Sequence, residues 1–303
     1  TLLIKDIFNF QYNYGLFAIV FFTNLAYSLL TIMVLGKIYN SEAILFSEGF
    51  TSLKIFNKRS EMKKGQMPGY GDLILLICIS LLAIFYIGSY ATVKWGFWGV
   101  FVQQLIILLI PICYGWYMKT DFKKLFAIKI PGIKDIFAAI CVFAGCFCIN
   151  LLLSNVLSAF MKESAENLQT TFDYLLEQPF VLIVFVMSVM PAVGEELMFR
   201  GFTFGTLKEK NKPVVAMLIT SIIFGCYHFS LVKLIPTGFL GFLLAMLVYR
   251  TGSIFTGMLM HFLNNFVSLF VSKYEEQLVA KYPDFMDLSF GLGQNVNLIL
   301  MMV

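Results

Sequence analysis

Long apolar windows without charged residues dominate the chain. Windows that contain no Asp, Glu, Lys or Arg run over 16–36, 73–93, 97–118, 136–161, 178–194, 213–232, 234–249 and 251–272. A helix needs about 20 apolar residues, at about 1.5 Å each, to cross a bilayer. The pattern therefore predicts eight spanning helices, the fifth of which must continue from 178 through its charged residues to about 209. A last apolar window, 288–303, predicts a ninth span that is cut short.

The composition supports a membrane protein and excludes a soluble domain. Hydrophobic residues make up 59% of the chain and charged residues 13%, whereas soluble domains carry about 25% charged residues. Strands of a membrane barrel would alternate in polarity over about 10 residues, and no such alternation occurs here. We therefore expect an all-α, polytopic transmembrane helical bundle. Membrane lipid is the expected partner, and no basic stripe indicates binding to nucleic acid.

The distribution of basic residues predicts how the spans are oriented. The loops 37–72, 119–135 and 201–212, together with position 250, hold 15 Lys and Arg, whereas the loops on the other side hold 6. Positive residues are enriched on the cytoplasmic side of membrane proteins, so the first set of loops is expected there. The first residue is Thr rather than Met, which suggests a piece of a longer protein.

A few ionisable residues interrupt the apolar windows. The fifth span carries Glu195, Glu196 and Arg200 in the run PAVGEELMFRGF, and the two histidines of the chain, His228 and His261, both lie in apolar windows. Charges inside a bilayer are costly, so such residues are candidates for function. Counting from the cytoplasmic ends of their spans, Glu195, His228 and His261 lie at depths of about 21, 22 and 15 Å. One polar cluster inside the bundle is therefore feasible.

Helical spacing suggests how these side chains are paired. Glu196 and Arg200 are four residues apart, so they are expected to pair on one face. Glu195 is rotated by about 100° from Glu196 around an α-helix, so it is free to face elsewhere. His261 shares a face with Asn265, and Asn264 lies close to that face too. The spacing alone does not choose between the two asparagines.

The cluster contains the groups needed for hydrolysis by an activated water. A carboxylate shielded from water holds its proton more tightly and can act as a general base, and His and Asn side chains can stabilise an oxyanion. Glu195, His228 and His261 could instead bind zinc, although the chain has no H-E-x-x-H motif. It has no G-x-S-x-G motif either. A structural alternative is a buried ion pair with hydrogen bonds that hold the bundle together.

The ordered motifs resemble those of the CPBP family of intramembrane proteases, which includes CAAX prenyl endopeptidases of the Rce type. E-E-x-x-x-R matches Glu195, Glu196 and Arg200, F-x-x-x-H matches Phe224 and His228, and H-x-x-x-N matches His261 and Asn265. The resemblance implies that Glu195 activates water with the help of His228, and that His261 and Asn265 form the oxyanion site. Glu196 and Arg200 would position the glutamate or the substrate. The resemblance leaves open whether zinc is required.

A second resemblance concerns the first part of the chain. Residues 1–65, a single span with a basic cytoplasmic tail, are similar to the end of an ABC-2 type permease, which implies an ABC transporter permease or ATPase as partner. Residues 66–303 would then form the CPBP domain, with its motif core at 180–272. We expect an endopeptidase of the bacterial cell membrane that acts on membrane-associated peptides or proteins. The alternative is a non-hydrolytic transport or bacteriocin-immunity scaffold, for which internal repeats would be typical.

Overall fold

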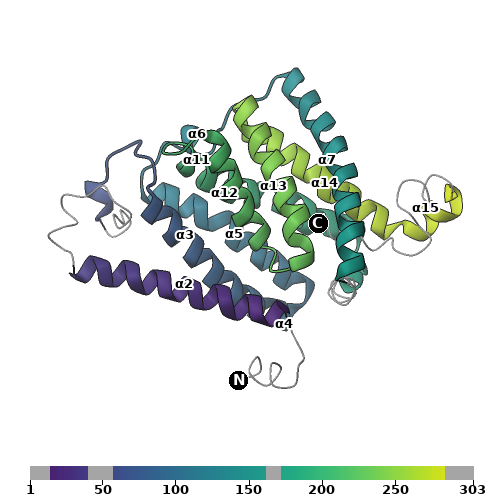
Figure 1. Ribbon diagram of the computed structural model, residues 1–303, viewed down its shortest axis with the longest axis horizontal. Coiled ribbons are helices and arrows are strands. Elements are labelled where there is room, and N and C mark those ends of the chain that lie inside the picture. Colours follow the sequence, from purple (N-terminus) through teal and green to yellow (C-terminus); the bar gives the residue numbers. More distant parts are fainter. Residues whose placement is uncertain (1–13, 40–56, 162–171, 284–303) are drawn as a thin grey trace. The chain divides into compact units, whose positions relative to one another are not determined.

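The computed structural model describes residues 14–39, 57–161 and 172–283, and in these ranges the regular structure is helical without strands (Figure 1). Six of the described helices are long and apolar enough to cross a membrane. They are Tyr70–Trp95, Phe97–Tyr117, Ile133–Ser154, Phe180–Leu207, Leu231–Thr251 and Ile254–Lys273. The prediction of an all-α, polytopic membrane bundle is therefore confirmed.

The other two predicted spans correspond to shorter apolar stretches. One is Phe17–Met33 within α2 (Tyr14–Tyr39), and the other is α12 (Pro213–Cys226). The apolar window 288–303 lies outside the described residues. The number of complete spans among the described residues is thus six by length and composition, compared with the eight that the windows predicted.

The boundary between the sixth and seventh predicted spans was placed wrongly. The chain leaves α12 at Cys226, turns through residues 227–230, and begins α13 (Leu231–Thr251) earlier than expected. The side chain of Ser230 accepts a hydrogen bond from the backbone N–H of Lys233 and so caps α13. His228 therefore lies in a turn rather than in a helix, and Lys233 lies in a helix rather than in a loop. A count of charge-free windows misses such a cap, because it registers hydropathy alone.

The described chain divides into two compact units. The first contains the described residues up to Ile128 together with Leu197–Ala216. In it, α2 packs against α3 (Tyr70–Ala83), and α4 (Ser89–Trp95) packs against α5 (Phe97–Tyr117). The boundary predicted at 65/66 stays a prediction, because these units divide the chain at other places.

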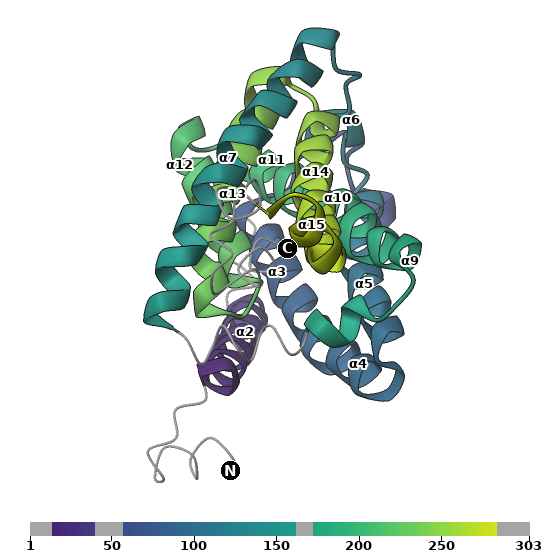
Figure 2. The same ribbon diagram turned by 90° about the vertical axis from the view of Figure 1, so that its right-hand side faces the viewer.

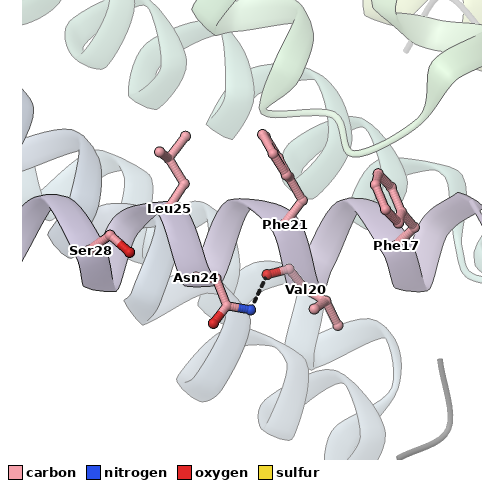
Figure 3. A pocket seen from close by; sticks show the side chains of 6 residues that line it. All are labelled: Phe17, Val20, Phe21, Asn24, Leu25 and Ser28. Carbon is pink, nitrogen blue, oxygen red and sulfur yellow. Dashed lines mark hydrogen bonds between the residues drawn. The ribbon is translucent and has the colours of Figure 1, made fainter. Parts of the chain in front are cut away.

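One face of α2 forms an apolar pocket in the first unit (Figure 3). Its lining residues follow helical spacing and are Phe17, Val20, Phe21, Asn24, Leu25 and Ser28. The Asn24 amide donates to the carbonyl of Val20 in the preceding turn, over 2.7 Å. None of the lining residues belongs to the polar cluster that the sequence predicts.

The second unit, Lys129–Glu196 with the described residues from Met217 onward, is built on three long helices. These are α7 (Ile133–Phe160), α13 and α14 (Ile254–Lys273), which pack against one another (Figures 1 and 2). Their shared core contains Ala139, Cys146, Leu240, Leu244, Leu247 and Met260. Where α13 ends and α14 begins, the Ser253 hydroxyl donates to the Lys129 carbonyl over 2.5 Å. This bond joins the segment just before α7 to the connection between α13 and α14.

The span Phe180–Leu207 departs from regular α-helix at two places. Its π-helical segments are η4 (Phe185–Val189) and η5 (Glu196–Thr203), which flank α10 (Met190–Glu195). Pro191 has no N–H to donate to the carbonyl of Met187 one turn earlier. π-Helical turns in otherwise regular helices are common at functional sites. The two carboxylates of the E-E-x-x-x-R motif lie where α10 meets η5.

Candidate active site

A buried contact between Glu196 and His261 is central to the polar cluster of the second unit. The Nδ1 atom of His261 lies 3.0 Å from Oε1 of Glu196, and the side chains are only 4% and 0% exposed. A carboxylate accepts hydrogen bonds, so Nδ1 carries a proton and donates it. Such a bond fixes both the orientation of the ring and the position of that proton. The sequence analysis predicts that Glu196 pairs with Arg200, and it does not predict the contact of Glu196 with His261.

A glycine on α14 makes room for this contact. A Cβ atom on Gly257 would lie 2.6 Å from Oε2 of Glu196 and 2.7 Å from Cγ2 of Val248. Real Cβ atoms essentially never approach other atoms so closely. Gly257 and His261 are four residues apart and share a face of the helix. The same face thus provides both the space for the carboxylate and its histidine partner.

Glu195 reaches the other side of the same imidazole. Its Oε2 atom lies 3.8 Å from Nε2 of His261, and its side chain is 12% exposed. This separation is too long for a direct hydrogen bond, but one water can bond to both atoms at about 2.8 Å. The helical wheel left Glu195 free to face elsewhere, and in the structure it faces the same histidine as Glu196. The two carboxylates instead flank one ring, at the point where the helix changes from α to π.

His228 is positioned by the residue that begins its motif. Its Nδ1 atom lies 3.0 Å from the carbonyl oxygen of Phe224, which can only accept, so Nδ1 carries a proton. The Phe224 ring contacts both histidines edge to face, at 5.0 Å from His228 and 6.0 Å from His261. Phe224, the first residue of the F-x-x-x-H motif, therefore supplies the carbonyl that orients His228 and the ring that contacts both histidines. Water-mediated contact between His228 and Glu195 stays a prediction.

The two asparagines of α14 have different surroundings. The Asn265 amide donates to the Met187 carbonyl over 3.1 Å, and the Asn264 amide donates to Oδ1 of Asn265 over 3.2 Å. The Met187 carbonyl is the one to which Pro191 cannot donate, which explains why a side chain can bind there. Since an amide group has two N–H donors, Asn265 retains a second one for a ligand.

Arg200 is buried, with 1% of its surface exposed. It lies in the π-helical segment η5, in which backbone hydrogen bonds join residues five apart. The sequence spacing predicts that Glu196 and Arg200 pair on one face of the helix. That pair stays a prediction.

Lys233 is a buried charged residue of the second unit. The sequence analysis had placed it in a loop. It is 5% exposed, and its Nζ atom lies 4.5 Å from the centre of the Phe172 ring. One feature of the sequence could have indicated that Lys233 is buried. In HFSLVKLIPTGF, a lone Lys follows His228 by five residues within an apolar stretch.

The predicted zinc ligands are Glu195, His228 and His261. Both histidines present Nδ1 to an acceptor, which is typical of metal-binding and of catalytic histidines. Within the described residues, however, no three His, Cys, Asp or Glu side chains are grouped closely enough to hold a metal ion. Glu195, His228 and His261 are therefore not assembled as ligands.

Comparisons with known proteins match the part of the chain that carries this site. Residues 177–267 match the family described as type II CAAX prenyl endopeptidase Rce1-like. Over 101 residues, the chain is 36% identical to a Bacillus subtilis (strain 168) protein named "Putative membrane peptidase YdiL". The match covers 33% of this chain and 41% of that protein, so the chain spans less than half of this curated relative. No solved structure matches the chain.

The matched segment and the long helices together decide the classification. Residues 177–267 contain every candidate residue of the site, from Glu195 to Asn265. Six described helices are long and apolar enough to cross a membrane. The chain is therefore an integral membrane protein, and its residues 177–267 are similar to the Rce1-like family of type II CAAX prenyl endopeptidases.

Proposed function

We propose that this protein is an intramembrane endopeptidase that hydrolyses membrane-associated peptides or proteins with a water activated by Glu195. The observation that carries the proposal is the contact of both Glu195 and Glu196 with opposite nitrogens of His261. Such a contact resembles the arrangement of a catalytic base beside an oriented histidine. It lies in the segment that matches the endopeptidase family.

In the proposed reaction, Glu195 takes a proton from a water bound between its Oε2 and the His261 ring. The resulting hydroxide attacks the carbonyl carbon of the scissile peptide bond. Glu195 then returns the proton to the leaving amine, so that the carboxylate is restored at the end of the cycle. Glu196 does not take part in proton transfer but holds the imidazole through Nδ1.

The developing oxyanion needs N–H donors that are already in place. Asn265 offers its second amide N–H, because its first is held by the Met187 carbonyl. His261 can donate from Nε2 when both of its ring nitrogens carry protons. His228 faces the same Phe224 ring from the turn after α12 and would support the water or the leaving group.

The proposal is tested with the purified protein in nanodiscs and a library of membrane-associated peptides. Mass spectrometry should detect new termini that are absent with Glu195→Gln. Serine- and thiol-directed covalent inhibitors should have no specific effect, because no acyl-enzyme forms. Peptide binding without cleavage by the wild-type protein would instead favour the non-hydrolytic scaffold. Inhibition by a serine- or thiol-directed reagent would contradict the proposed nucleophile.

A further inference from the structure

Three basic segments of the first unit are fastened to one another at the ends of its helices. The first, residues 57–66, lies against the turn that follows α5. The backbone N–H of Gly65 donates to the carbonyl of Lys119 over 2.8 Å, and Nζ of Lys119 donates back to the carbonyl of Met62 over 3.2 Å. Met62 is itself buried, with 6% of its surface exposed. The connection before α3 is therefore held to the end of α5 by hydrogen bonds in both directions.

The segment 207–212 is joined to the same group of helix ends. Nζ of Lys124 lies 2.9 Å from Oε2 of Glu209. The Asn211 amide donates to the hydroxyl of Tyr70 over 2.8 Å, at the residue where α3 begins. Residues far apart in the sequence thus form one surface. We call residues 57–66, 116–124 and 207–212 the basic platform.

The basic platform has a strong excess of positive charge. It contains ten Lys or Arg and three Asp or Glu, whereas the whole chain has a net charge of only +4. Eight of these ten basic residues are exposed. The preference of basic loops for the cytoplasmic side explains why each segment is basic. It does not explain why the segments are fastened together, because like charges that are held close to one another repel unless an anion lies between them.

The basic platform lies where membrane headgroups are expected. Three helices that are long and apolar enough to cross a membrane begin or end there, at Tyr70, Tyr117 and Leu207. Trp116, in the last turn of α5, is 60% exposed, and the guanidinium carbon of Arg59 lies 4.4 Å from the centre of its ring. Tryptophan is enriched at the level of the headgroups, and basic clusters beside spanning helices attract anionic lipids. The position, the charge and the exposed indole therefore favour a lipid over a soluble acidic partner.

We propose that the basic platform binds the phosphate groups of anionic phospholipids and holds several of their headgroups at one end of the first unit. Ammonium and guanidinium groups form charge-assisted hydrogen bonds with phosphate oxygens. Each Lys or Arg close to an anionic surface strengthens the attraction by about fivefold. A zwitterionic headgroup also has a phosphate, but its own ammonium group cancels the charge. The platform therefore discriminates between the two classes of lipid, and this binding does not depend on the proposed hydrolysis.

Lipid binding is measured by native mass spectrometry of the protein in detergent. The protein is titrated with phosphatidylglycerol or with phosphatidylcholine that has the same acyl chains. The test variant carries Lys63→Gln and Lys64→Gln, because these lysines are exposed and their side chains make none of the contacts that fasten the segments together. The matched control carries Lys94→Gln and Lys281→Gln, which remove the same charge from exposed positions outside the platform.

The wild type should bind phosphatidylglycerol at least about tenfold more tightly than phosphatidylcholine, and high salt should remove this preference. The test variant should bind phosphatidylglycerol about 10- to 25-fold more weakly than the wild type. The control variant should stay within about twofold of the wild type, and the affinity for phosphatidylcholine should be the same in all three proteins. Circular dichroism should show the same helical content in all three, because the substitutions are exposed.

Three results would overturn the proposal. A wild type without preference for phosphatidylglycerol would show that the platform does not select anionic lipids. An equal loss of affinity in the control variant would show that only the total charge of the protein matters. Tighter binding of soluble polyglutamate than of phosphatidylglycerol would indicate an acidic protein partner instead of a lipid.

Discussion

The substitution Gly257→Ala tests whether the Glu196–His261 contact holds the candidate site together. It adds a single methyl group on α14, where the new Cβ would lie 2.6 Å from Oε2 of Glu196. Ordinary van der Waals contact begins at 3.4 Å, so the carboxylate would have to retreat by the difference, about 0.8 Å. The hydrogen bond to His261, now 3.0 Å long, would then be stretched beyond its useful range.

The expected cost follows from two contributions. Overpacking a tightly filled interior costs about 1–3 kcal/mol, and weakening a hydrogen bond to a charged group costs about 1.5–3 kcal/mol. Replacing a helical Gly by Ala returns about 1 kcal/mol through helix propensity. The net destabilisation should therefore be about 1.5–5 kcal/mol. Activity should fall as well, because His261 loses the group that orients it.

The assay is thermal unfolding in nanodiscs, with peptide cleavage measured on the folded fraction. The matched control is Gly145→Ala on α7, where a Cβ would meet no atom within 4 Å. That substitution should be neutral or stabilise by up to about 1 kcal/mol. If Gly257→Ala has the stability and activity of Gly145→Ala, the packing argument for Glu196 is refuted.

Three further predictions concern the oxyanion donor, zinc and an acidic group outside the spans. Asn265→Ala should slow cleavage by about 10²–10³-fold, with KM nearly unchanged, and an unaltered rate would remove Asn265 from the mechanism. A zinc chelator should leave the rate unchanged, since the described His and acidic side chains are not grouped as ligands; a loss reversed by added zinc would show that they assemble during turnover. Burial, and then the charges of Glu276 and Asp173, raise the pKa of Glu275 above its usual range, so the charged carboxylate destabilises the fold at neutral pH. Glu275→Gln should therefore raise the melting temperature at pH 7, and this gain should disappear as the pH falls through the raised pKa of Glu275. An equal gain at pH 7 and at a pH below that pKa would contradict the prediction, as would the same gain from the exposed Glu61→Gln.

The sequence predicts the depth of the site residues along their helices better than the direction in which their side chains point around the helix axis. Helix rise is nearly constant, so counting residues from the span ends placed Glu195 and His261 at comparable depths, and they lie 3.8 Å apart. Rotation was predicted for a regular α-helix, but η5 begins at Glu196. The change of helix type brings both carboxylates to one histidine, which a helical wheel cannot anticipate.

The sequence is least informative at the α12–α13 turn. A hydropathy window treats His228 as part of a span and Lys233 as a loop charge, because it registers polarity without backbone geometry. The structure instead turns through Phe229, which adopts a positive φ of 48°, and restarts the helix at the Ser230 cap. A Ser followed by an apolar run was visible as a cap signal, but nothing in the pattern shows that Lys233 points inward.

The central claim is that Glu195 activates the water that hydrolyses the peptide bond. The most direct test is the single-turnover cleavage rate of Glu195→Gln compared with the wild type, on one peptide identified from the library. Both proteins must show the same helical content and bind the peptide. The account predicts a loss of about 10²–10⁴-fold. A variant that binds the peptide and retains its cleavage rate within about threefold would show that another group activates the water.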